Sequence, residues 1–156
     1  MESNINNIHP SKEDEEEIQR YINEKDLLQA KKKISDLALI YKNSLTLIYY
    51  DSFIKNLEGD FTGAIKGYKK LIEMNPNVWI FNHNLGLIYF KQKKYLDASE
   101  LFEKAIKIEN NKLSFHYLGC CHYEVYEYLE AKKCFQKTLD MDPKFLFGQC
   151  NLSSVY

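Results

Sequence analysis

Glycine and proline are scarce in this sequence, with six and three residues in a chain of 156. Because both residues interrupt helices, their scarcity leaves room for long helical segments. The hydrophobic content of 45% excludes disorder for most of the chain. The composition therefore favours a mostly helical protein.

An excess of charge of either sign and long apolar runs are also lacking. Lysine and arginine number 21 and the acidic residues number 22, so no broad basic field attracts nucleic acid or an anionic membrane. The apolar stretches are too short for a membrane-spanning helix, and the polar, acidic start is unlike a secretory signal. We therefore expect a cytoplasmic or nuclear chain with no nucleic-acid partner and no membrane insertion.

Cysteine is sparse too, and its placement is poor for a disulfide framework. The four cysteines lie in the C-terminal third, where two are adjacent: Cys120, Cys121, Cys134 and Cys150. We expect reduced thiols. A glycine-rich phosphate loop, a Gly-x-Ser-x-Gly nucleophile and a His-Glu-x-x-His motif are all missing from the sequence. We therefore expect no catalytic residue, no cofactor and no enzyme activity.

Two histidines and two cysteines near one another raise the alternative of a metal site. His116 and Cys120 are one helical turn apart and share a helix face, as two zinc ligands would. Cys121 and His122 point away from that face, whereas structural zinc needs four converging ligands. We therefore expect no metal site.

A repeat with a period of about 34 residues runs through the sequence. Four alanines recur at nearly equal spacing, with the last interval one position shorter than the others: Ala30, Ala64, Ala98 and Ala131. A large apolar residue lies three positions before each alanine, and another lies four positions after it. These offsets place all three residues on one face of a helix. The period indicates an architecture of stacked repeats.

Two repeats carry a glycine in their first half, where a helix is expected. Gly86 and Gly119 each follow a leucine and stand at the same distance before the repeat alanine. A glycine inside a helix costs about 1 kcal/mol relative to alanine, so its recurrence needs a compensating gain. We expect that gain from two closely packed helices, with the glycine on the first and the alanine on the second. Gly59 and Lys93 mark the turns between such helices.

This pattern resembles the tetratricopeptide repeat (TPR), a helix-turn-helix unit of about 34 residues. Residues 79–112 match nearly every position, whereas the following repeat has Thr138 in place of an alanine and the preceding one has Ser52 in place of the glycine. The resemblance implies an all-α fold, a right-handed α-solenoid or superhelix. We expect a flexible tail at 1–10 and a TPR domain at 11–156, divided into a degenerate repeat at 11–44, repeats at 45–78, 79–111 and 112–145, and a partial or capping helix at 146–156.

The resemblance also implies a non-catalytic scaffold or adaptor that binds peptide segments or partner subunits of a multiprotein complex. In a TPR superhelix the first helix of each repeat lines the inner wall, and a neutral, aromatic wall suits a peptide with apolar anchors. The alternative is that several of these side chains pack against neighbouring first helices and bind nothing. The expected peptide-binding residues are Tyr49, Phe53, His83, Asn84, Leu87, His116, Tyr117, Cys120, Cys150 and Asn151.

Some TPR domains hold the C-terminal carboxylate of Hsp70 or Hsp90 through five lysine, asparagine and arginine side chains on successive first helices. Asn84 matches the central asparagine of that set. The other four positions fail, because they hold Tyr49, Phe53, Leu113 and Tyr117. A chaperone cofactor of this kind is therefore disfavoured.

Narrower alternatives also follow from the resemblance. One is a TPR targeting segment of a larger enzyme that continues past Tyr156. Another rests on HNLG at 83–86 and LGCCH at 118–122, which are similar, more weakly, to the TPR subunit of the BBSome, a cilium-associated trafficking coat. Self-association through the apolar C-terminal helix at 146–156 is a further expectation.

Two runs of like charge lie in the first repeat. The acidic run at 13–17 could dock a basic partner, but the favoured interpretation is the solvated first turn of a helix, where negative charge interacts favourably with the helix dipole. The three lysines at 31–33 are expected to be ordinary outer-face charge.

Overall fold

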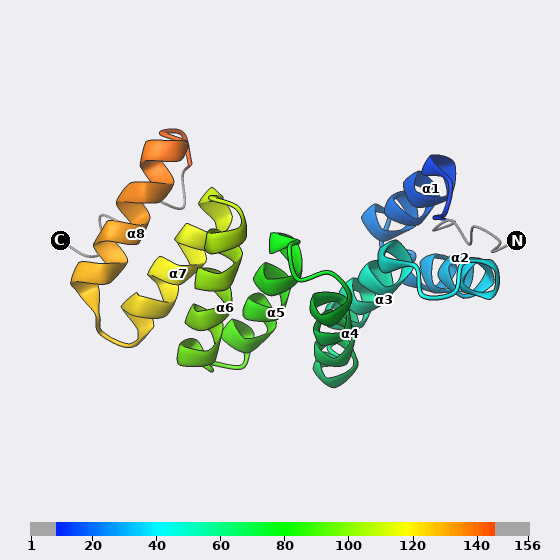
Figure 1. The fold of residues 1–156 in the computed structure, drawn as a ribbon, viewed down its shortest axis with the longest axis horizontal. Helices are drawn as coiled ribbons and strands as arrows, with labels where there is room; N and C mark the ends of the chain where they lie inside the picture. The colour runs from blue at the N-terminus through cyan, green and yellow to red at the C-terminus, as the bar shows by residue number, and fades with distance from the viewer. Residues whose placement is uncertain (1–8, 146–156) are drawn as a thin grey trace, which may run out of the picture. The chain divides into compact units, whose positions relative to one another are not determined.

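The computed structural model describes residues 9–145, and its described regular structure consists of α-helices. The tail expected at 1–10 and the C-terminal helix expected at 146–156, with Cys150 and Asn151, fall wholly or mainly outside these residues. The helices (Figure 1) are α1 (Lys12–Asn23), α2 (Leu27–Ile40), α3 (Leu45–Glu58), α4 (Phe61–Met74), α5 (Trp79–Lys91), α6 (Tyr95–Ile108), α7 (Lys112–Glu124) and α8 (Tyr128–Met141).

The chain divides into two units, and each is built from helical hairpins. Unit 1, Met1–Met74, contains α1 to α4, and unit 2, Asn75–Tyr156, contains α5 to α8. Within the units, the hairpins are α1 with α2, α3 with α4, α5 with α6, and α7 with α8. The second helix of a hairpin also packs on the first helix of the next, as α2 does on α3 and α6 does on α7.

The turn inside each hairpin repeats one backbone conformation. Its left-handed residues are Lys25, Gly59, Lys93 and Tyr126, each at the same distance before the repeat alanine. The residue that follows each of them donates a backbone hydrogen bond to the last turn of the preceding helix, as Lys94 N does to Tyr89 O at 2.9 Å. This arrangement satisfies carbonyl groups that the helix end leaves unpaired. A left-handed conformation favours glycine, yet glycine occupies only Gly59 among these four positions.

In unit 2, the repeat glycines make room for aromatic rings rather than for the alanines. A Cβ atom built on Gly86 would lie 2.9 Å from Cε1 of Phe102, and one built on Gly119 would lie 2.6 Å from Cε1 of Phe135. Both distances are too short for carbon atoms in contact, and both rings are almost completely buried. The gain that offsets the helical glycine is therefore a ring packed directly on the backbone.

The α3–α4 hairpin of unit 1 places its glycine on the opposite helix. Ser52 occupies the position equivalent to Gly86, and its hydroxyl donates to Ile48 O at 2.6 Å. Gly67 on α4 faces it, and a Cβ atom there would overlap the Ser52 hydroxyl. The close contact between the two helices is thus kept while the small residue moves from one helix to the other.

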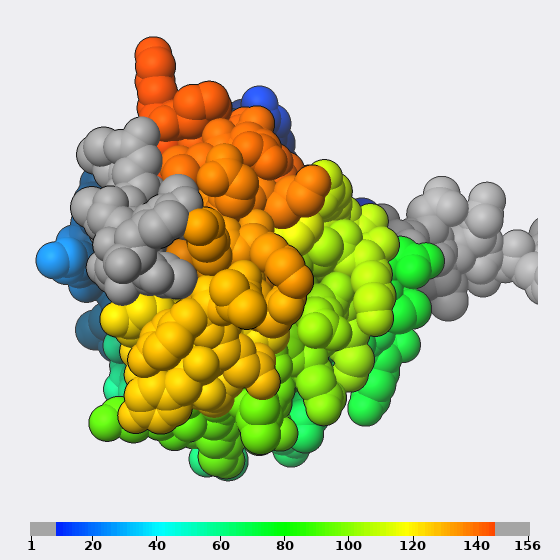
Figure 2. All heavy atoms as spheres, turned by 90° about the vertical axis from the view of Figure 1, so that its left-hand side faces the viewer, coloured from blue at the N-terminus to red at the C-terminus, as the bar shows by residue number. Residues whose placement is uncertain are grey.

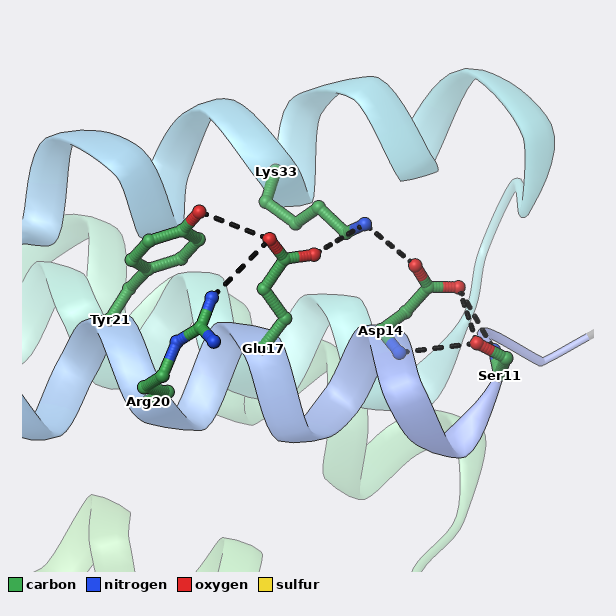
Figure 3. A network of polar contacts seen from close by, with 6 residues as sticks. All are labelled: Ser11, Asp14, Glu17, Arg20, Tyr21 and Lys33. Atoms are coloured by element: carbon green, nitrogen blue, oxygen red, sulfur yellow. Dashed lines mark hydrogen bonds and ion pairs between the residues drawn. The ribbon is translucent and has the colours of Figure 1, made fainter.

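The α1–α2 hairpin combines a small aliphatic core with a polar network. Ile18 and Ala30 are fully buried at its centre. Above them Lys33 reaches from α2 to two carboxylates on α1, with Nζ 2.7 Å from Asp14 Oδ1 and 2.8 Å from Glu17 Oε2 (Figure 3). The prediction that all three lysines at 31–33 are ordinary outer-face charge is therefore wrong for Lys33.

Further bonds fix the two carboxylates of this network. Asp14 and Ser11 form a capping box at the start of α1, and the Tyr21 hydroxyl donates to Glu17 Oε1 at 3.0 Å (Figure 3). Hydrogen bonds from Lys33 lower the pKa of both carboxyl groups, and the same bonds raise the pKa of the Lys33 ammonium. The acidic run therefore pairs partly with α2 instead of lying wholly in solvent.

Candidate functional site

The residues predicted to bind a peptide lie on the first helices of three hairpins. Tyr49 and Phe53 lie on α3 of unit 1. Six others lie on two packed helices of unit 2 and define the α5–α7 face: His83, Asn84, Leu87, His116, Tyr117 and Cys120. The two sets belong to different units, so each is described separately.

One position of the repeat packs the same way in every hairpin where it was predicted. Tyr49, His83 and His116 stand at the same place in three successive repeats. Each ring lies against an aromatic ring on the second helix of the same hairpin. The ring centroids are 6.2 Å apart for Tyr49 and Tyr68, 5.5 Å for His83 and Phe102, and 6.0 Å for His116 and Phe135. This position therefore belongs to the packing between the two helices of a hairpin.

Three residues of the α5–α7 face are buried, which corrects the expectation that they form an open wall. His83 is 3% exposed, Asn84 is 7% exposed and His116 is 7% exposed. The burial of these three is consistent with the alternative given from the sequence, that several side chains of the set pack against neighbouring helices. A ligand on this face would contact the residues around them instead.

His83 joins the two hairpins of unit 2. Its Nδ1 atom lies 3.0 Å from the hydroxyl oxygen of Ser114, which is fully buried on α7. Its ring also meets the edges of Trp79 and Tyr117 at centroid distances of 5.6 and 5.8 Å. Burial lowers the pKa of His83 to about 4, so the imidazole is neutral at physiological pH.

Tyr117 lies at the centre of an aromatic cluster and still reaches the surface. Its ring stacks on Phe102 at 5.7 Å and meets Phe90 and His116 at 5.8 and 5.1 Å. The residue is partly exposed, and burial raises the pKa of its hydroxyl, with a smaller contribution from Cys120. Tyr117 therefore has both a packing role and a face available to a ligand.

His116 and Cys120 form a neutral pair one turn apart on α7. The Cys120 sulfur lies 3.7 Å from His116 Nε2, and the edge of Phe145 covers the imidazole at 5.2 Å. Burial lowers the pKa of His116 and, with the nearby Glu124 carboxylate, raises the pKa of Cys120 to about 12. Both groups are therefore uncharged at pH 7.

The exposed part of the α5–α7 face is apolar. Leu87, Tyr117 and Cys120 are partly exposed there, and no member of the six-residue set is charged at neutral pH. The two helices end in opposite charges: α5 ends at Lys91 and α7 ends at Glu124. Such a surface can bind apolar side chains, whereas an anionic group would lose hydration without gaining a cation among these residues.

In unit 1, α3 offers a smaller aromatic surface. Tyr49 stacks on Phe53 with ring centroids 6.3 Å apart, and its edge meets Tyr50 at 5.6 Å. All three residues are partly exposed. Their arrangement fits packing along one side of α3 and leaves part of each ring accessible.

The described thiols and the buried serine give no support to covalent catalysis. Burial raises the pKa of Cys121 to about 12 and that of Cys134 to about 11, so both are protonated and poorly nucleophilic at neutral pH. Ser114 is near an imidazole but is inaccessible to a substrate. Within residues 9–145, no group of three or more His, Cys, Asp or Glu side chains is placed to hold a metal ion.

Sequence reasoning did not include three residues that complete the α5–α7 face. Ser114 bonds to His83, Trp79 packs on His83, and Phe145 packs on His116. Trp79 and Phe145 could have been found from the repeat, because Trp79, Lys112 and Phe145 follow one another at equal intervals in the sequence. Ser114 has no such signal, since its separation from His83 does not match the repeat period.

Comparison with known proteins identifies the repeat. The family profile for the tetratricopeptide repeat matches residues 79–112. Among solved structures, MamA 41-end from Desulfovibrio magneticus RS-1 matches with a TM-score of 0.79 and 19% identity, over 92% of this chain and 82% of that chain. The predicted all-α tetratricopeptide-repeat fold is thereby confirmed. A search of curated protein sequences finds no match.

Two further matches are structures of peptide complexes. The first TPR of Spaghetti (RPAP3), bound to the HSP90 peptide SRMEEVD, has a TM-score of 0.69 and 19% identity over 71% of this chain and 89% of that chain. The second TPR domain of human RPAP3, in complex with the HSP70 peptide SGPTIEEVD, has a TM-score of 0.65 and 23% identity over 67% of this chain and 88% of that chain.

In residues 9–145, no helix is both long and apolar enough to cross a membrane.

Proposed function

From the premise that residues 79–112 are a tetratricopeptide repeat, we propose that this chain is a non-catalytic protein-interaction scaffold. Its proposed ligand is a peptide segment of a partner protein, bound on the α5–α7 face of unit 2. Two structures of the same fold hold peptides, which supports a binding role for the fold. Assembly of a multiprotein complex would follow from such binding.

The observation that carries this proposal is a set of three partly exposed side chains with little polarity, Leu87, Tyr117 and Cys120, of which Leu87 and Tyr117 pack against one buried cluster. These side chains rest on buried groups that fix their positions, since Tyr117 stacks on Phe102 and His116 lies beside Cys120. A preorganised surface loses little conformational entropy when a ligand binds. Apolar anchors of an extended or helical peptide would fill it.

The chemistry of the face argues for a neutral peptide and against an acidic C-terminus. The peptides in the two similar structures end in Glu-Glu-Val-Asp, which presents several carboxylates. The six residues of the α5–α7 face include no lysine or arginine. A carboxylate placed there would lose its hydration shell without an ionic partner, which is costly.

A peptide array tests the ligand class directly. The full chain is labelled and applied to arrayed peptides that vary in charge and in aromatic content, with SRMEEVD and SGPTIEEVD included. We expect neutral peptides with aliphatic or aromatic anchors to bind, and the two acidic peptides to bind weakly or not at all. Preferential capture of the acidic peptides would contradict the proposed ligand class.

Leu87 provides the matched test of the location. Leu87→Glu places a carboxylate on the face and should weaken binding of the captured peptide, as calorimetric titration would measure. Leu39→Glu is the control, because Leu39 is 77% exposed on α2 of unit 1. If wild type and Leu87→Glu bind the peptide with equal affinity, and circular dichroism shows that both are folded, the peptide binds at another place.

A further inference from the structure

The two hairpin turns of unit 2 carry opposite charge. The basic turn, between α5 and α6, contains Lys91, Lys93 and Lys94, and the acidic turn, between α7 and α8, contains Glu124 and Glu127. All five residues are exposed. Figure 1 shows both turns on the same side of unit 2.

Apolar side chains accompany these charges. Next to the acidic turn, Tyr126 is 78% exposed and Leu129 is 77% exposed, and next to the basic turn, Leu96 is 69% exposed. The Tyr126 ring lies 6.2 Å from that of Tyr128, so two tyrosines form one aromatic surface. The α7–α8 hairpin that carries them forms much of the end of unit 2 that faces the viewer in Figure 2. Exposed tyrosine rings are enriched in protein contact surfaces, and a contiguous exposed apolar patch often marks one.

The acidic turn makes contacts within the chain and still stays exposed. Glu127 Oε2 lies 2.6 Å from His122 Nδ1, and Glu124 accepts a hydrogen bond from Tyr95 at the start of α6. Lys94 Nζ lies over the Tyr89 ring at 5.6 Å. This last contact has the geometry of a cation–π pair within one chain.

We propose that two copies of the chain associate through these turns, with the basic turn of each copy facing the acidic turn of the other. A two-fold axis between the turns reverses their order, so that both contacts form at once and the interface closes on itself. Lysines of one copy would then lie against the carboxylates and the Tyr126 and Tyr128 rings of the second.

A second copy is the favoured occupant because the required counter-charge lies on the same edge of the same chain. The distance from the basic turn to the acidic turn is necessarily identical in both copies, so their charges match without further adjustment. The contacting charges are exposed, and exposed ion pairs are individually weak and screened by salt. The dimer is therefore expected to form at low ionic strength and to dissociate at high ionic strength.

A charge-exchange experiment tests this pairing in the full chain. Lys93→Glu with Lys94→Glu leaves both turns acidic, and Glu124→Lys with Glu127→Lys leaves both turns basic. By sedimentation at low salt, wild type should have twice the mass of one chain, and each variant alone should be monomeric. An equimolar mixture of the two variants should restore the dimer, because each turn then meets its opposite charge.

Several outcomes would overturn the proposal. A wild-type chain that stays monomeric at low salt would overturn it. Variants that remain dimeric would also overturn it and would indicate association through the C-terminal segment instead. Folded variants that fail to associate when mixed would also exclude the paired turns. Peptide binding on the α5–α7 face should be unchanged in the Lys93→Glu, Lys94→Glu variant, whose changes lie outside the six residues of that face. Failure of the dimer is therefore distinct from failure of the proposed function.

Discussion

The first hairpin of unit 1 and the first hairpin of unit 2 have the same helix-turn-helix form but different interiors. Between α1 and α2, aliphatic residues such as Ile18 and Ala30 form the core, and Lys33 links the helices through two carboxylates. Between α5 and α6, the Phe102 ring packs directly on Gly86. One repeat geometry can therefore be built around an aliphatic core with ion pairs at its edge, or around an aromatic ring packed directly on the backbone.

This difference predicts different sensitivities in the two units. Ion pairs near the surface respond to salt and tolerate changes of volume, whereas a ring packed on a backbone responds to any added atom. A buried imidazole adds acid sensitivity, and among the described hairpins it occurs at the shared repeat position only in unit 2, as His83 and His116. In unit 1 that position holds Glu15 on α1 and Tyr49 on α3.

The largest expected effect comes from filling the glycine position of unit 2. Gly86→Leu should destabilise the protein by about 3 kcal/mol or more, because even a Cβ atom would lie 2.9 Å from the buried Phe102 ring. Chemical denaturation measures the loss. Gly86→Ala should give a smaller loss in the same direction, and a leucine variant as stable as wild type would show that the ring does not pack on Gly86.

Acid should destabilise unit 2 through His83. Its folded-state pKa of about 4 lies below the ordinary 6.5, so the unfolded chain binds the proton first and stability falls as pH drops from 6.5 towards 4. The contribution amounts to about 3 kcal/mol over that range. Urea titrations of wild type and His83→Phe at several pH values measure it.

The slope of stability against pH is the readout for His83, since His83→Phe also removes the bond to Ser114. The phenylalanine variant should show a flatter dependence between pH 6.5 and 4. Part of the slope should remain, because burial also lowers the pKa of His116. Identical slopes for both proteins would mean that the imidazole is solvated.

Removing Lys33 should give a smaller, salt-dependent effect in unit 1. Lys33→Met leaves the Asp14 and Glu17 carboxylates near each other without their cation, so the melting temperature should fall at low salt. The difference should shrink at high salt, where wild type gains less from these pairs. Lys32→Met is the control, because Lys32 is the neighbouring exposed residue. Equal shifts of the melting temperature in both variants would show that Lys33 does not bridge the two helices.

The smallest expected effect concerns the left-handed turn residues. Lys25→Gly should stabilise unit 1 by about 0.5–1 kcal/mol, because a Cβ atom is unfavourable at its φ of 61°. Gly59, at φ 84° in the next hairpin, should show the opposite sign when changed to lysine. Thermal melts measure both, with Lys25→Ala as the control that keeps the Cβ atom and should bring no gain.

The repeat register could be predicted from the sequence because packing repeats with it. Ala64, Ala98 and Ala131 are each fully buried, as an alanine at the contact of two helices must be. Only one part of the Ser52 and Gly67 pair could be predicted. Comparing the repeats shows that Ser52 replaces a glycine, but it does not show which residue of α4 makes room for the serine.

Two other features could not be predicted, for physical reasons. Lys25, Lys93 and Tyr126 adopt left-handed conformations that their own side chains disfavour, so hydrogen bonds of the turn outweigh local preference. The burial of His83 and Asn84 depends on how α5 packs against α6 and α7, and helical spacing alone does not give that depth. Only the direction in which a residue points follows from its spacing.

The binding face is tested most directly by nuclear magnetic resonance of the isotopically labelled full chain. A neutral peptide selected from the array is titrated in, and the amide signals that shift are assigned. Binding on the α5–α7 face predicts the largest shifts around 83–87 on α5 and 116–120 on α7, and their loss in Leu87→Glu but not in Leu39→Glu. Shifts confined to α6 and α8, with both variants binding like wild type, would contradict it.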